Sequence, residues 1–126
     1  MPYLVPGTLD EALTLLADRR PAVVAGCTDV LRARRQGQPS GDILDVTRLP
    51  ELRGIGQGPQ GWRIGAATTW AEIAATPLPP AFDALREAAR EVGAVQIQNA
   101  GTVAGNICNA SPAADGVPPL MALEAE

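Results

Sequence analysis

Small residues and polar side chains are mixed along the stretch from Gln98 to Leu123, which offers little acid–base or nucleophilic chemistry. The small residues are Gly101, Ala104, Gly105, Ala110, Ala113, Ala114 and Gly116, and the polar ones are Asn106, Asn109, Ser111 and Asp115. Glycine lets a backbone approach a bound group closely, and consecutive backbone N–H groups form anion-binding nests. The pattern indicates a segment that holds a phosphorylated cofactor, although this composition is also typical of plain turns.

A second turn of small residues lies upstream, in the sequence PAVVAGCTDVL at Pro21–Leu31. An apolar run ends there at Gly26, and Thr28 and Asp29 follow it. A strand that runs into a glycine-containing turn is a common phosphate-binding arrangement. The chain lacks the full GxGxxG dinucleotide pattern, so the inference rests on the two turns together. We expect them to converge in space, with Gly26 near Gly105.

The composition argues against several other kinds of site. The chain has 126 residues, enough for one domain or two small subdomains, and its net charge of −4 argues against nucleic acid as the main partner. Histidine is absent, which removes the commonest general base and metal ligand. Cys27 and Cys108 are too few for a four-thiolate metal site and fit either buried apolar fillers or a redox pair. The sequence shows no signal-peptide pattern or long apolar span, so we expect a cytoplasmic protein.

Hydrophobic periodicity and turn residues predict an α+β fold that begins with a βαβ unit. Capping boxes start helices at Thr8 with Glu11 and at Thr69 with Glu72. Helices are expected at Leu9–Ala17, Val30–Arg35 and Phe82–Val92, between Thr69 and Pro77, and from an Asp115 cap to Leu123. Strands are expected at Tyr3–Val5, Ala22–Ala25, Ile43–Val46, Leu52–Ile55 and Trp62–Ala66, and a loop region at Gln96–Asn109. We divide the chain into a βαβ subdomain at residues 1–57 and a mixed α/β subdomain at residues 58–126.

Four segments resemble the FAD-binding domain, or medium subunit, of the molybdenum hydroxylases, the family of xanthine dehydrogenase, aldehyde oxidase and carbon monoxide dehydrogenase. They are Val23–Leu31, Ile43–Ile55, Trp62–Ile73 and, with the most specific order and spacing, Gln98–Ala125. The resemblance covers essentially the whole chain and corresponds to the N-terminal part of the PCMH-type FAD-binding fold.

This resemblance implies an FAD-binding electron-transfer component of a multi-component oxidoreductase. It would pass electrons from an iron–sulfur small subunit, with 2Fe-2S clusters, to NAD+ or another acceptor. Molybdopterin would lie on a large subunit, where the organic substrate is oxidised. The alternative is a non-catalytic fragment or assembly scaffold that does not bind FAD by itself.

The resemblance also assigns cofactor-binding residues, and neither a catalytic residue nor a metal ligand on this chain. The first loop would wrap the FAD pyrophosphate with backbone N–H groups, and the second would lie on the same cofactor. Asp115 matches a position that hydrogen-bonds the cofactor, and Asn109 a polar position that faces the flavin region. The first loop comprises Val23, Val24, Ala25, Gly26, Cys27, Thr28, Asp29 and Val30, and the second comprises Thr102, Val103, Ala104, Gly105 and Asn106.

The chain departs from the family pattern at two places. Cys27 stands where the family often has glycine, and Ala104–Gly105 replaces a usual glycine pair. The family domain also continues beyond the length of this chain and completes the flavin pocket there, so we expect the chain alone to bind FAD weakly or not at all. We expect Gly105→Val to weaken FAD binding more than folding, because a branched side chain would occupy the approach of the cofactor.

Overall fold

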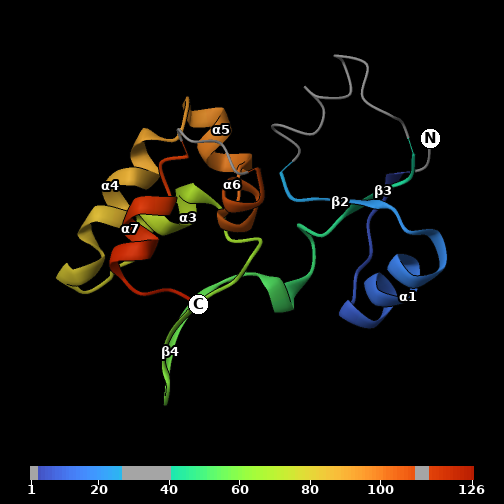
Figure 1. Cartoon of the computed structure of the whole chain (residues 1–126), viewed down its shortest axis with the longest axis horizontal. Helices are drawn as coiled ribbons and strands as arrows, with labels where there is room; N and C mark the ends of the chain where they lie inside the picture. Colours follow the sequence, from blue (N-terminus) through green and yellow to red (C-terminus); the bar gives the residue numbers. More distant parts are fainter. Residues whose placement is uncertain (1–2, 27–40, 110–113) are drawn as a thin grey trace.

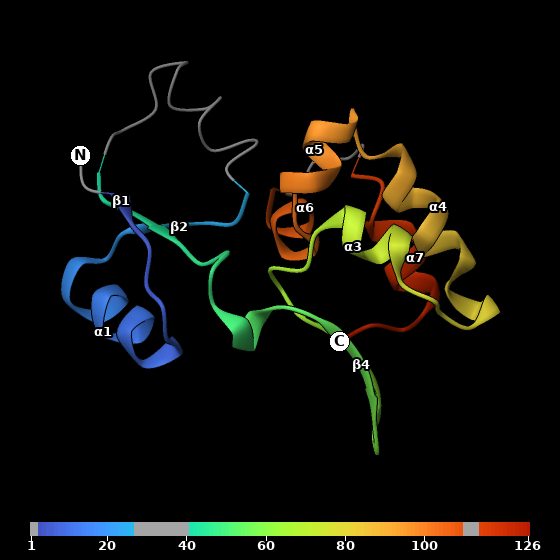
Figure 2. The ribbon, with the colours of Figure 1, turned by 180° about the vertical axis from the view of Figure 1, so that it is seen from behind.

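The computed structural model describes residues 3–26, 41–109 and 114–126. Figure 1 shows two groups of elements, strands with helix α1 in one and short helices in the other, with the hairpin that contains β4 projecting from them. The view from behind shows the same separation (Figure 2). The segments from both groups that form the candidate site lie where the groups meet.

A three-stranded parallel sheet forms the N-terminal group. Its order is β1 (Tyr3–Leu4), β3 (Ile43–Asp45) and β2 (Ala22–Val24). The central strand β3 is therefore the last of these three strands in the sequence. Helix α1 (Leu9–Arg19) connects β1 to β2, and the Thr8 side chain caps it by accepting the N–H of Glu11. The Glu11 carboxylate accepts the N–H of Gly7, so only half of the predicted capping box forms. The expected βαβ start is present, with β3 between its two strands.

An antiparallel hairpin follows the sheet. It consists of β4 (Ile55–Gly58) and β5 (Gly61–Ile64), with Pro59 and Gln60 at its turn. The expected strand at Leu52–Ile55 is wrong, because a 3₁₀ turn η1 (Pro50–Leu52) begins at Pro50, whose ring fixes φ in a range suited to a turn. The hairpin packs on the helices, where Trp62 meets Phe82 edge-on with ring centroids 5.5 Å apart.

Short helices form the second group. They are α3 (Trp70–Ala75), α4 (Asp83–Glu91), α5 (Val95–Ala100), α6 (Val103–Asn109) and α7 (Val117–Ala122), with a 3₁₀ turn η2 (Pro80–Phe82) before α4. Their shared core consists of Trp70, Ile73, Phe82, Leu85, Ala89 and Val103. Thr69 and Glu72 make both hydrogen bonds of the predicted capping box.

Two expectations about the C-terminal stretch are wrong. The expected loop at Gln96–Asn109 is instead α5 and α6, separated by Gly101 and Thr102, and Thr102 pairs with Thr69 in an isolated antiparallel bridge. These tertiary contacts outweigh the low helix propensity of glycine and asparagine. Asp115 does not cap α7, because Gly116 is the N-cap residue and no side chain bonds there.

These elements confirm the predicted α+β class. The division at residue 57 stays a prediction, and that residue lies inside β4. The expected helix at Val30–Arg35 lies outside the described residues. Within the part of the chain that the structure describes, no helix is long and apolar enough to cross a membrane, and no cluster of three or more potential ligands could hold a metal ion.

Candidate functional site

The turn after β2 approaches the end of α5 at Gly26. Gly26 has a φ of +86°, and a Cβ built there would lie 2.0 Å from the carbonyl oxygen of Ala100. Only glycine, which has no Cβ, allows the two backbones to come this close. The turn also follows the carboxyl end of a parallel strand, the edge at which open α/β sheets bind their ligands. Ala100 was not predicted as a site residue. Its contact with Gly26 is made by a backbone carbonyl, and no residue type at position 100 signals such a contact.

Thr102 joins this turn to α6. Its side chain is 1% exposed, and its hydroxyl donates to the carbonyl oxygen of Ala25 at 3.4 Å. The same hydroxyl accepts the N–H of Gly105 at 3.2 Å and so acts as the N-terminal cap of α6. These contacts confirm the prediction that the Gly26 and Gly105 segments converge.

Gly105 faces the protein and not open space. A Cβ there would lie 3.0 Å from the Thr102 hydroxyl oxygen and 3.2 Å from the Ala25 carbonyl oxygen. A valine at this position would therefore meet Thr102 and Ala25 first, and its effect on the approach of a cofactor stays a prediction. The added side chain would press the two segments apart, so folding and cofactor binding would change together.

Backbone N–H groups at the start of α6 are bonded within the protein. Their acceptors are Thr68 O for Val103 at 3.0 Å, Ala66 O for Ala104 at 3.1 Å and Thr102 O for Asn106 at 3.0 Å. The Gly105 N–H uses the Thr102 hydroxyl. These four groups therefore form no open anion-binding nest, and residues 102–106 support the turn after β2 from the side.

Asn106 holds a third segment against α6. Its Oδ1 accepts the N–H of Gly116 at 3.3 Å. A Cβ at Gly116 would lie 2.5 Å from the ring of Trp70, so glycine is required by this close approach. Asp115 immediately precedes Gly116 and its side chain is exposed, which places a carboxylate on the surface beside α6.

The remaining predicted site residues differ in their surroundings. Val24 and Val103 are 2% and 7% exposed, so their side chains support the site from the core. Val23 is half-exposed on β2. Cys27, Thr28, Asp29 and Val30 lie outside the described residues, as does the side chain of Asn109, the last residue of α6. The roles predicted for them stay predictions.

Asp45 ends β3 at the same edge of the sheet. Its carboxylate accepts the Tyr3 hydroxyl at 2.5 Å, and the N–H and hydroxyl of Thr47 at 2.9 and 2.6 Å. Partial burial by itself raises the pKa of this carboxyl group. The hydrogen bonds from Thr47 and Tyr3, with the positive charge of Arg48, outweigh burial and lower the pKa of Asp45 below its ordinary value of 3.8. The carboxylate thereby fixes β1 and the turn after β3.

Asp45→Asn should therefore cost stability at neutral pH and much less in acid. A carboxyl group whose pKa is lower in the folded state contributes stability that is present above the unfolded-state pKa and lost as the pH falls through the folded-state value. Urea unfolding of the variant and the parent, from neutral pH to below 3.8, measures this difference. Asp18→Asn on the exposed end of α1 is the control, and a deficit in Asp45→Asn that does not shrink in acid would contradict the prediction.

A family comparison decides the identity of this fold. The family model described as the FAD binding domain in molybdopterin dehydrogenase matches residues 1–126, the whole chain. The chain belongs to this family. The resemblance carried by the four sequence segments is confirmed, and the cofactor of the domain is FAD.

Curated relatives in this family are subunits of dehydrogenases. The chain is 38% identical to the putative xanthine dehydrogenase FAD-binding subunit XdhB of Escherichia coli (strain K12), over 98% of this chain and 44% of that protein. It is 36% identical to the nicotinate dehydrogenase FAD-subunit of Eubacterium barkeri, over 98% of this chain and 43% of that protein. The chain thus spans less than half the length of these relatives.

Solved structures share the fold. The carbon monoxide dehydrogenase from Hydrogenophaga pseudoflava matches with a TM-score of 0.77 and 28% identity, over 89% of this chain and 40% of that chain. The reconstituted CO dehydrogenase from Oligotropha carboxidovorans matches with a TM-score of 0.79 over 92% of this chain and 42% of that chain, at 23% identity, which bears on the fold alone. The predicted FAD-binding fold is confirmed.

The described residues fit an FAD site at its first loop. Gly26 lies at the ligand-binding edge of the sheet, where its close approach to the Ala100 carbonyl holds the backbone of the turn in place. Exposed Asp115 adds a hydrogen-bonding group next to Gly116, which Asn106 holds against α6. The start of α6 fits a supporting role, because its N–H groups are bonded elsewhere.

Proposed function

We propose that the chain binds FAD where the Ala25–Gly26 turn, the start of α6 and Asp115 come together. The approach of Gly26 to the Ala100 carbonyl supports this most strongly, because it leaves the turn at the carboxyl edge of β2 with its backbone held in one conformation. Thr102 holds the turn through Ala25, and Asn106 holds Asp115 nearby through its neighbour Gly116. Thr102 and Asn106 thus position the turn and Asp115, and these would contact the cofactor.

The function that follows is electron transfer within a molybdenum-hydroxylase-type dehydrogenase. Bound FAD supplies the redox chemistry, so the chain needs no catalytic histidine. Electrons would arrive from an iron–sulfur small subunit and leave to NAD+ or another acceptor, while a molybdenum-cofactor large subunit oxidises the substrate. Names of relatives such as FAD-binding subunit and medium chain support a division of labour among subunits.

Isothermal titration of the chain with FAD tests the proposal. We expect weak binding that ADP reduces by competition and riboflavin does not, because the Ala25–Gly26 turn would meet the pyrophosphate. The affinity should be low because the chain spans less than half the length of its relatives, and each missing contact costs about 1 kcal/mol. FAD should then bind tightly, with a yellow flavin absorbance, once the partner subunits are added.

Two results would contradict this expectation in different ways. A sub-micromolar dissociation constant for the chain alone would show that the flavin pocket is complete within these residues. No binding of FAD, either alone or with the partner subunits, would overturn the proposal in favour of an assembly scaffold.

A further inference from the structure

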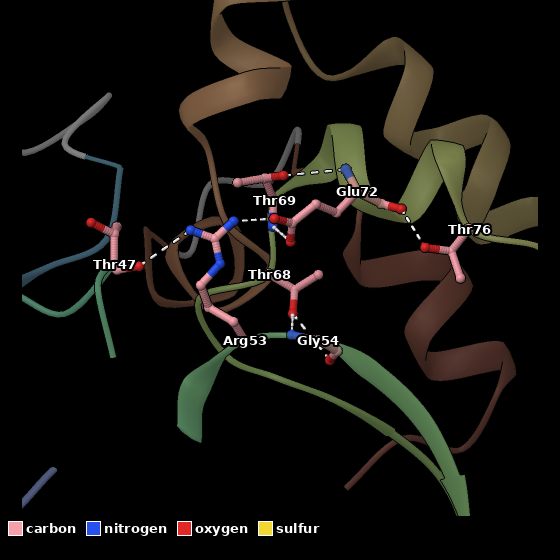
Figure 3. Close-up of polar contacts among 7 residues, drawn as sticks. All are labelled: Thr47, Arg53, Gly54, Thr68, Thr69, Glu72 and Thr76. Carbon is pink, nitrogen blue, oxygen red and sulfur yellow. Dashed lines mark hydrogen bonds and ion pairs between the residues drawn. The ribbon is translucent and has the colours of Figure 1, made fainter. Parts of the chain in front are cut away.

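Arg53 connects the two groups of elements at a point separate from the Gly26 contact. Figure 3 shows its guanidinium group between Thr47 and Glu72. One nitrogen, Nη1, donates to the carbonyl oxygen of Thr47 at 3.4 Å, and Nη2 forms an ion pair with Oε1 of Glu72. We call these three residues the Arg53 bridge.

The Thr47 end of the bridge is fixed to the N-terminal sheet. The N–H and hydroxyl of Thr47 both donate to Oδ1 of Asp45, the last residue of the central strand β3. Since β2 and β3 are hydrogen-bonded neighbours, the position of Thr47 is tied to the strand that leads into the Ala25–Gly26 turn.

The Glu72 end of the bridge is fixed to the first turn of α3. Oε2 of Glu72 accepts the N–H of Thr69 at 3.1 Å as part of the capping box. This turn also pairs with the segment that meets Gly26, because the Trp70 N–H donates to the Gly101 carbonyl at 3.2 Å. The bridge therefore links β3 to the same backbone that receives the turn after β2.

The two groups face each other across an open cleft on this side. A cleft of about 670 Å³ lies here, lined from the sheet side by Thr47 and Arg48 and from the helix side by Thr68, Glu72 and Thr76, with Arg53 spanning between them. Beside this cleft, the hydrogen bond and the ion pair of Arg53 join the two sides directly. The side chains of Arg53 and Glu72 are 41% and 38% exposed, so the pair contributes little to global stability.

We propose that Arg53 is a positioning residue that holds the N-terminal sheet against the helices so that the Ala25–Gly26 turn meets Thr102. This inference rests on the proposed FAD site. It identifies the residue that aligns the two halves of that site, the Ala25–Gly26 turn and the segment at Thr102. Losing the bridge would leave the chain folded but lower the fraction of molecules in which the two halves are aligned. The apparent affinity for FAD falls in proportion to that fraction.

Four variants separate this role from a general effect of charge. Arg53→Ala removes the bridge, and Arg53→Lys restores one donor and should rescue part of the effect. Glu72→Gln removes the ion pair while its amide oxygen still accepts the Thr69 N–H, so the capping box is retained. Arg63→Ala is the matched control, because Arg63 is an exposed arginine that donates to the Glu51 carbonyl without bonding Thr47.

Two measurements are made on each variant of the full chain. Isothermal titration gives the FAD dissociation constant, which we expect to rise about three- to tenfold for Arg53→Ala and by less than about twofold for Arg63→Ala. Pulsed electron spin resonance without FAD gives the distance between spin labels at Ala17→Cys on α1 and Glu87→Cys on α4, with Cys27 and Cys108 replaced by serine. The distance distribution should broaden in Arg53→Ala while the urea midpoint changes little.

Each outcome bears on one proposal or the other. An Arg53→Ala chain with the distances and FAD affinity of Arg63→Ala would overturn the positioning role. Weaker FAD binding without broadened distances would also overturn it, because Arg53 would then act on the cofactor directly. A parent chain that binds no FAD, either alone or with the partner subunits, together with broadened distances in Arg53→Ala, would overturn the proposed FAD site and leave the positioning of the two groups intact.

Discussion

Replacing Gly26 with alanine should destabilise the fold by about 2–4 kcal/mol and weaken FAD binding at least tenfold. Two effects combine in this substitution. The φ of +86° disfavours any residue with a Cβ, and that Cβ would lie 2.0 Å from the Ala100 carbonyl oxygen, so the turn must move away from α5. Urea unfolding and isothermal titration with FAD measure the two losses.

Gly61→Ala provides the control for Gly26→Ala. Gly61 has a φ of +122°, but nothing lies within 4 Å of a Cβ built there, so this substitution carries the dihedral strain without the collision. It should cost about 1–2 kcal/mol and leave FAD affinity unchanged. If Gly26→Ala is no more destabilising than Gly61→Ala, the close approach of the two backbones does not exist in solution.

Thr102→Val should cost about 1.5–3 kcal/mol of stability and weaken FAD binding with it. Valine keeps the shape of the buried side chain but removes the oxygen that accepts the Gly105 N–H and donates to the Ala25 carbonyl. The N-terminus of α6 then loses its cap, and the turn after β2 loses a lateral support. The same unfolding and titration measurements apply.

Thr102→Ser is the rescue variant for this prediction, and Thr14→Val is its control. Serine retains the hydroxyl and should recover most of the loss in both measurements. Thr14 is an exposed residue of α1 whose hydroxyl donates to the Asp10 carbonyl, so its replacement by valine should change stability by no more than about 0.5 kcal/mol. A serine variant as impaired as the valine variant would show that the hydroxyl is not what holds the two segments together.

The sequence correctly predicted the helix starts and strands that are determined by residues a few positions apart. Thr69 and Glu72 mark the start of α3 because the capping box joins residues only three positions apart, and the structure contains both of its bonds. The parallel strands at Ala22–Val24 and Ile43–Asp45 follow from short apolar runs. The four segments that resemble the molybdenum hydroxylase FAD-binding domain predicted the family, which the family model confirms over the whole chain.

Contacts between distant residues help to explain the two wrong predictions for the C-terminal stretch. The composition of Gln96–Asn109 is typical of a loop, yet Thr102 makes α6 begin there by capping Gly105 and pairing with Thr69. The position of Asp115 before an apolar run suggested a helix cap, but the Asn106 side chain binds Gly116 and α7 starts without a side-chain cap. Thr69 is distant in the sequence from Thr102, and Asn106 lies ten residues before Gly116, so no local pattern contains these two contacts.

The sequence by itself determined the α+β class and the two glycine-containing turns, because these depend on residue types a few positions apart, and its resemblance to a known family indicated the family and the cofactor. Only the tertiary structure decided how the turns are packed. It showed that Gly26 receives the Ala100 carbonyl, that Gly105 faces Thr102 and Ala25, and that the N–H groups of α6 are bonded within the protein. It also revealed Arg53 between Thr47 and Glu72. Such contacts depend on where a Cβ or a carbonyl points in the folded chain. That direction cannot be inferred from the spacing of residues in the sequence.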